Sequence, residues 1–76
     1  MCLGIPMRVT EIEKNFKAYA ETMGVKRPIS IKLVPETKPG DFVLVHAGFA
    51  MEKIDPVEAR KRIELFEKML NLEGLD

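Results

Sequence analysis

The fold is decided by one stretch of the sequence, Pro39-Gly40-Asp41-Phe42-Val43-Leu44-Val45-His46-Ala47-Gly48-Phe49-Ala50. Its four consecutive apolar residues predict a β-strand over 42–47 that is buried on both faces. Gly48 interrupts this strand, as at a bulge or a close approach of two backbones, and a last strand is expected over 49–54. Two prolines and a glycine in 35–41 predict an irregular loop before the strand.

Upstream of that loop, apolar and polar residues alternate in three segments, which predict further strands over 7–12, 16–23 and 25–34. Asn15 closes a polar turn between the first two and is suited to a positive φ. Pro28 indicates that the third strand lies at an edge or begins irregularly.

Alternation also predicts which side chains of these strands face the same way. The second strand should place Phe16, Ala18 and Ala20 on one face. The third should place Ile29, Ile31 and Leu33 together.

Downstream, the sequence predicts a helix over 55–73. Asp55 is a good N-cap, and Pro56 suits the first helical position. One apolar stripe follows at spacings of four, three and four residues, and Gly74 is expected to lie past the helix end. The stripe consists of Ala59, Ile63, Phe66 and Leu70.

Short strands followed by one helix favour a small β-barrel or rolled sheet, because closure removes exposed strand edges. The length of 76 residues fits a single domain with a thin core. We therefore expect a shallow surface site, or one that a partner completes, in place of a deep catalytic pocket.

Composition narrows the class of protein. Twelve basic and twelve acidic residues cancel, so the basic excess typical of nucleic-acid-binding proteins is absent, although a local patch can lie within a neutral total. A single cysteine excludes an internal disulfide. No apolar run approaches the roughly 20 residues that span a bilayer, and residues 1–6 do not resemble a secretory signal. We expect a soluble protein of a reducing, intracellular compartment.

Cys2 and His46 are the residues best suited to chemistry. Removal of Met1 would leave an N-terminal cysteine whose thiolate and α-amine both bind soft metals. On composition and spacing alone, an inert small apolar residue is an equally good interpretation of Cys2. Histidine is the commonest metal ligand, but a lone histidine at a strand end is more often packed or hydrogen-bonded.

One cysteine and one histidine are too few for a closed zinc site, which takes four ligands. They could supply part of a coordination sphere that a partner completes. A Cys/His hydrolase would need a third, orienting group, and no local signature supports one.

Two motifs carry a resemblance to a known family. The N-terminal Met1-Cys2-Leu3-Gly4-Ile5-Pro6 and the stretch from Pro39 to Ala50 resemble the motifs M-C-L-[AG]-[IV]-P and P-G-D-[YF]-V-L-V-H-x-G-F-A. These are the motifs of the HypC/HupF/HoxL family of [NiFe]-hydrogenase maturation chaperones. They occur in the family's order, at the family's chain length, and the resemblance covers the whole chain.

The resemblance implies a mainly β fold, a small OB-like β-barrel over 1–54 with a C-terminal α-helix over 55–73, in one domain. It implies a cytoplasmic chaperone and no enzymatic activity. Family members bind the scaffold protein HypD, on which an Fe(CN)2CO unit is assembled with cyanide from HypE and HypF. The chaperone then hands this iron unit to the precursor of the hydrogenase large subunit.

The resemblance also implies roles for individual residues. Cys2 would contact both partners and bind the iron, with His46 close to it. The flank of the helix around Leu65 and Leu72 would add to the partner surface. The full set expected to bind partners is Cys2, Leu3, Gly4, Ile5, Pro6 and His46.

Two other classes of protein stay open. An OB-type nucleic-acid-binding module would need basic residues interleaved with exposed aromatic rings on one barrel face. A small structural subunit would make Cys2 incidental.

Overall fold

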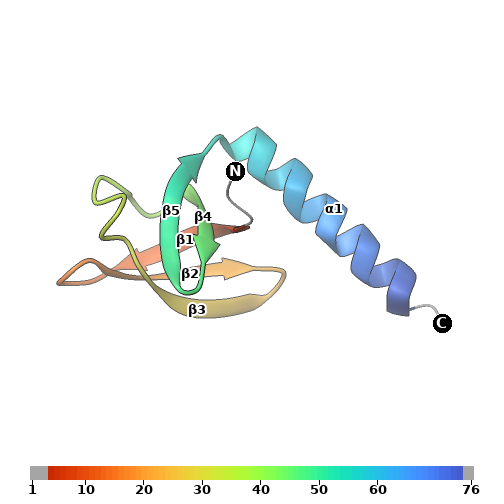
Figure 1. Cartoon of the computed structure of the whole chain (residues 1–76), viewed down its shortest axis with the longest axis horizontal. Helices are drawn as coiled ribbons and strands as arrows, with labels where there is room; N and C mark the ends of the chain where they lie inside the picture. The colour runs from red at the N-terminus through yellow and green to blue at the C-terminus, as the bar shows by residue number, and fades with distance from the viewer. Residues whose placement is uncertain (1–3, 75–76) are drawn as a thin grey trace.

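A computed structural model describes residues 4–74, and their side chains as far as residue 70. The described chain forms five strands and one helix, in which the strands close into a barrel of order β1-β2-β3-β5-β4 and the helix projects from it (Figure 1). This arrangement confirms the predicted OB-like barrel with a C-terminal helix. The elements are β1 Ile5–Ile12, β2 Lys17–Thr22, β3 Val25–Ser30, β4 Phe42–His46, β5 Phe49–Ile54 and α1 Pro56–Gly74.

Antiparallel pairing joins β1 to β2, β2 to β3, β4 to β5 and β1 to β4. The barrel is closed between β3 and β5 by a single parallel pair, Ser30 with Phe49. The Ser30 N–H also donates to the Gly48 carbonyl oxygen at 2.9 Å. All five strands therefore have a neighbour on both sides, although β3 and β5 meet at this one residue pair.

Two hairpins turn through two-residue connections with positive φ at both residues. The β2–β3 turn has φ 50° at Met23 and 81° at Gly24, and the β4–β5 turn has 55° at Ala47 and 84° at Gly48. Positive φ at both central positions is typical of type I′ turns, whose twist matches that of the flanking strands. The turn before β2 contains Asn15 with φ 60°, as the sequence predicted.

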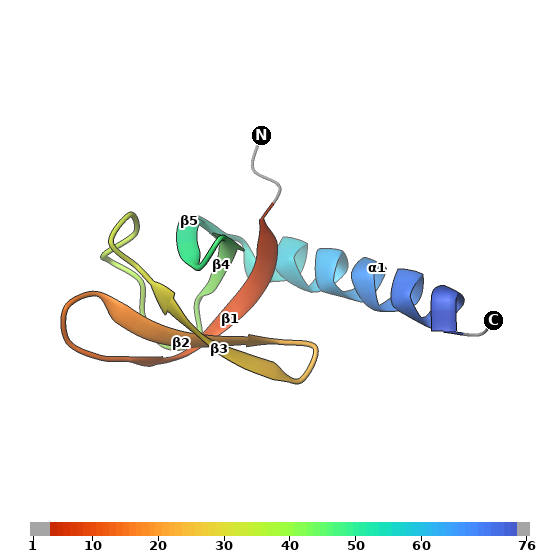
Figure 2. The ribbon, with the colours of Figure 1, turned by 60° about the horizontal axis from the view of Figure 1, so that its bottom comes forward.

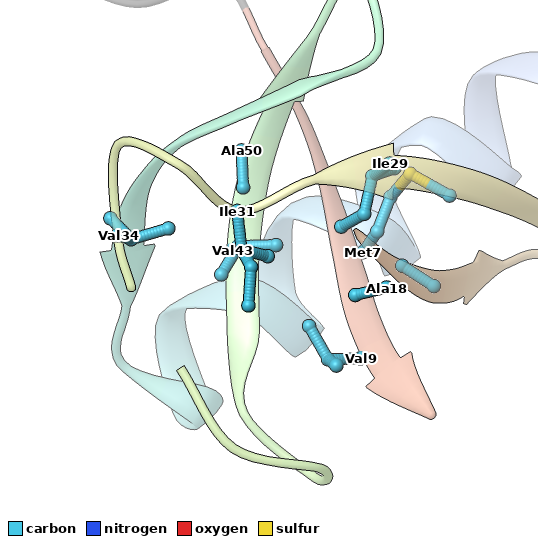
Figure 3. Packing of buried hydrophobic residues seen from close by; sticks show 9 residues of the cluster. Met7, Val9, Ala18, Ile29, Ile31, Val34, Val43 and Ala50 are labelled. Atoms are coloured by element: carbon cyan, nitrogen blue, oxygen red, sulfur yellow. The ribbon is translucent and has the colours of Figure 1, made fainter. Parts of the chain in front are cut away.

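The core fills the inside of the barrel with small and β-branched side chains (Figure 3). Val9 on β1 and Val43 on β4 are fully buried, as are Ala18 and Ala20 on β2. Every strand therefore contributes to one core. Its members are Met7, Val9, Ala18, Ala20, Ile29, Ile31, Val34, Val43 and Ala50.

Two predicted orientations are wrong. Phe16 has φ 61° and precedes β2, so its side chain leaves the strand alternation and is 48% exposed. The third strand ends at Ser30, well before the predicted Val34. From Ile31 the chain turns, with the Val34 N–H donating to the Ile31 carbonyl at 3.1 Å. Ile31 and Val34 both point inward as a result, and Leu33 is 57% exposed.

The helix begins as predicted. The Asp55 carboxylate accepts hydrogen bonds from the N–H groups of Val57 at 3.0 Å and Glu58 at 3.2 Å, which satisfies donors that a helix start leaves free. The helix continues through Gly74, one residue beyond the predicted end.

Only the first part of the predicted apolar stripe reaches the barrel. Ala59 is fully buried and Ile63 half-buried, where α1 packs on β1 and β4. Beyond them the helix extends away from the barrel, and Leu70 is 56% exposed (Figures 1 and 2). The stripe is longer than the strand surface available to cover it.

Candidate functional site

His46 ends β4 and lies opposite Phe49 across the Ala47–Gly48 turn. Its side chain is exposed, so the imidazole is not a packed core group. The turn fixes the direction in which β4 ends and therefore the place from which His46 projects.

Pairing of β1 with β4 brings the end of the N-terminal motif beside this histidine. Ile5 is paired with Val45 and Pro6 with Leu44. Continuing this antiparallel register by one residue places Gly4 beside His46. The two motifs, which lie far apart in the sequence, are therefore adjacent in the barrel.

The described residues of the N-terminal motif differ in exposure. Ile5 is exposed and Gly4 is half-buried, whereas Pro6 is fully buried. Cys2 and Leu3 lie outside the residues that the structure describes. Among the four described members of the predicted partner-binding set, Ile5 and His46 have exposed side chains.

The outer face of β1 and β4 is supported by the start of α1. Strand alternation puts Pro6 and Leu44 on the face opposite the core residues Met7 and Val43, and both outer side chains are buried. The Arg60 guanidinium stacks over the Phe42 ring, 5.8 Å from its centroid. The helix therefore braces the two strands that carry the candidate site.

Other residues of the second motif have structural explanations. Gly40 has φ 95°, which favours glycine, and its N–H donates to the Val9 carbonyl at 2.7 Å. Asp41 accepts a hydrogen bond from the Lys38 N–H at 2.9 Å and pairs with Lys53 at 3.1 Å. The Lys38 N–H, opposed by partial burial and reinforced by Lys53, lowers the pKa of the Asp41 carboxyl. These contacts shape the entry into β4, and they give no structural reason for the exposed His46.

Two surface hollows, which sequence reasoning missed, both border the β4–β5 turn at Gly48. One is bordered by Ile5, Val45 and Ala47 from the candidate site and by Val25 and Arg27 from β3. The other is bordered by the exposed rings of Phe16 and Phe49 and by two lysines. Both hollows depend on the closure of β3 onto β5, which no local pattern signals.

A metal site is not complete within the described part of the chain. Among the side chains that the structure describes, those of residues 4–70, no three His, Cys, Asp or Glu are grouped closely enough to hold a metal ion. Residues 4–74 include no helix with both the length and the apolar character needed to cross a membrane. His46 alone is insufficient as a ligand set, so further ligands must come from elsewhere if metal is bound there.

Comparison with known proteins finds one matching family and several similar proteins. Residues 1–66 match the model of the HupF/HypC family. The hydrogenase maturation factor HypC of Helicobacter hepaticus is 45% identical, over 92% of this chain and 83% of the relative. HypC of Cupriavidus necator is 39% identical, over 91% and 77%. The hydrogenase maturation factor HybG of Escherichia coli is 37% identical, over 91% and 92%.

Proposed function

The chain belongs to the HupF/HypC family, and on that basis we propose that it is a chaperone for [NiFe]-hydrogenase maturation and not an enzyme. The observation that carries the proposal is the family match over residues 1–66, joined to relatives of 37% to 45% identity that are named hydrogenase maturation factors. The chaperone would act in the cytoplasm, where it would bind the precursor of the hydrogenase large subunit.

The cargo is an Fe(CN)2CO unit, held by Cys2 and handed on. A thiolate suits such an iron centre, because cyanide and carbon monoxide favour low-spin Fe(II) and a soft ligand matches it. Cys2 is two residues from Gly4, so covalent geometry keeps their Cα atoms within about 7 Å of each other. Ile5 is paired with Val45, and continuing that register puts Gly4 beside His46, which supports a site shared by Cys2 and His46.

The role of His46 is that of a neighbour to the cargo. Its exposed imidazole can act as a ligand, a hydrogen-bond donor or a proton acceptor. The braced pair of β1 and β4 supplies the rigid mount that such a site needs.

Partners complete the site. The scaffold protein HypD, with HypE reached through it, would deliver the iron unit, and the precursor of the hydrogenase large subunit would receive it. Cys2 and His46 are too few for a closed coordination sphere, which agrees with a site shared between proteins. The exposed Ile5, with Gly4 next to it, supports a contact surface around the N-terminal motif.

A nucleic-acid-binding function has less support from the barrel surface. Lys17 and Lys26 do lie over the Tyr19 ring, 5.5 and 5.6 Å from its centroid. However, Lys26 is also paired with Glu11 at 3.1 Å. Lys26, neutralised in this way, contributes little to phosphate binding, which depends on unpaired positive charge.

The direct test is Cys2→Ala, with Cys2→Ser as a second variant that keeps a small polar side chain. We expect both to keep the wild-type circular dichroism spectrum, to lose co-purification with HypD and to fail to restore hydrogenase activity in a strain that lacks the chaperone. Infrared bands of bound cyanide and carbon monoxide should disappear from the purified complex. Full hydrogenase activity with Cys2→Ala would refute the mechanism.

His46→Ala separates a role in the site from a role in the fold. Because the side chain is exposed, we expect an unchanged unfolding midpoint and a partial loss of hydrogenase maturation. Loss of the folded state would instead assign His46 to packing.

A further inference from the structure

The second half of α1 carries an apolar surface without a partner in the described chain. Leu65 is 59% exposed, and Phe66, Met69 and Leu70 are exposed as well. In both views of the ribbon this half lies clear of every strand (Figures 1 and 2). Apolar side chains at this density on a projecting helix indicate a surface that becomes buried in a complex.

The charge of the helix changes along its length. Its first turns contain Arg60, Lys61 and Arg62, whereas residues 64–74 contain three glutamates and one lysine. The projecting half is therefore both apolar and acidic, and it fits an apolar surface that is basic.

Such a surface lies on the barrel of the same protein. The hollow of about 370 Å³ between the β1–β2 turn, β3 and the β4–β5 turn has two exposed rings, Phe16 at 48% and Phe49 at 45%. Lys17 and Lys32 border it, and none of its lining residues is acidic. The exposed phenylalanine rings suit the apolar side chains of the helix, and the two lysines are opposite in charge to its glutamates.

The helix cannot reach this hollow within one chain. Its first turns are fixed on the outer face of β1 and β4, with Ala59 fully buried there, and from that point it runs away from the barrel. The hollow borders β3, on a different side of the barrel.

We propose that the acidic apolar half of α1 in one copy of the protein docks into the Phe16–Phe49 hollow of a second copy. A reciprocal exchange about a two-fold axis uses both surfaces of both copies and closes the assembly at two chains. The formal net charge of zero removes the long-range repulsion that keeps highly charged proteins apart. The contact joins charges of opposite sign, so it weakens at high salt.

The test measures association of the full chain by sedimentation velocity over a series of concentrations, with a thiol reductant present so that Cys2 cannot cross-link two copies. One double variant, Lys17→Glu with Lys32→Glu, reverses the charge of the hollow. Another double variant, Glu64→Lys with Glu67→Lys, reverses the charge of the projecting half of α1. All four side chains are exposed, so the folds should be unchanged, which circular dichroism checks.

We expect the wild type to form dimers that dissociate as salt is raised. Each double variant alone should associate at least about tenfold more weakly, because like charges then face each other. An equimolar mixture of the two should associate again, since each helix then meets a hollow of opposite charge. The matched control, Lys38→Glu with Lys61→Glu, reverses two exposed lysines that border neither surface and should associate as the wild type does.

A wild type that stays monomeric at about 100 µM, well above the micromolar range of weak specific dimers, would overturn the proposal. So would a mixture of the two reversed variants that remains monomeric. Equal weakening by the control variant would show that overall charge, and not this contact, controls association.

Discussion

Ala47→Asn should stabilise the fold, because it removes backbone strain from the turn beside the candidate site. Ala47 has φ 55° at the first position of the β4–β5 turn, and Gly48 follows with φ 84°. Left-handed backbone is unfavourable for alanine, since Cβ approaches the carbonyl oxygen. Asparagine tolerates this conformation better, and Asn-Gly is the preferred pair for a type I′ turn.

The size of the effect follows from this preference. A several-fold enrichment of asparagine over other non-glycine residues at positive φ corresponds to about 0.6–1 kcal/mol. For a chain of 76 residues, this free energy corresponds to a rise in Tm of about 2–8 °C. Ala47→Gly would raise the free energy of unfolding by less, because glycine also increases the conformational entropy of the unfolded chain.

Thermal unfolding followed by circular dichroism measures the shift, and the β2–β3 turn supplies a matched site. Met23 has φ 50° and is followed by Gly24, so Met23→Asn should raise Tm by a similar amount. Gly48→Ala should lower stability by about 1 kcal/mol. A Cβ at that position meets no atom of the described chain within 4 Å, so the cost is that of the backbone alone. An unchanged or lower Tm for Ala47→Asn, together with a neutral Gly48→Ala, would refute the reasoning.

Three further outcomes are expected. Ile31→Ala should cost about 2–5 kcal/mol in the free energy of unfolding and leave little folded protein, whereas Leu33→Ala should change it by less than about 0.5 kcal/mol, as urea titration can show. Asp55→Ala should cost about 1 kcal/mol and reduce the helical signal in circular dichroism, because two N–H groups lose their acceptor. The pKa of Asp41 is lowered in the folded state, so the stability it contributes is complete above the ordinary carboxyl range near about pH 4 and is lost as pH falls through its lowered value. Asp41→Asn should therefore be less stable than the wild type at pH 7, with a difference in urea midpoint that shrinks towards pH 2.

Local patterns predicted the elements that local interactions stabilise. The apolar run before His46 is a strand of the barrel, and Asp55 caps the helix as its spacing indicated. Ala18 and Ala20 face the core as alternation required. In each case the deciding interaction involves neighbours in the sequence, so the pattern carries the information.

The errors come from places where tertiary structure overrides alternation. Phe16 leaves its strand because the turn needs a second residue with positive φ after Asn15. Leu33 faces solvent because the chain turns after Ile31, where the Val34 N–H donates to the Ile31 carbonyl oxygen. The exposed end of the α1 stripe depends on how much outer surface β1 and β4 offer, which the helix sequence does not encode.

The candidate site was likewise predicted in part. The sequence singled out His46 and the N-terminal motif, and the β1–β4 register explains how they meet. Cys2, the residue on which the proposed chemistry depends, lies outside the described residues. The hollow between Phe16 and Phe49 was missed because three separate segments form it, and alternation had placed Phe16 on the same face as Ala18 and Ala20.

The β1–β4 pairing also has a consequence for the order in which the protein folds. The three hairpin pairings join neighbouring strands, whereas Ile5 finds Val45 only after most of the barrel sequence has been made and collapsed. Contacts between distant segments form slowly, because the chain loses loop entropy before they repay it. The surface that joins the N-terminal motif to His46 is therefore absent from any chain that has formed only its hairpins. A partner that binds this surface would therefore bind the protein only after its barrel has closed, and would not bind nascent or partly folded copies.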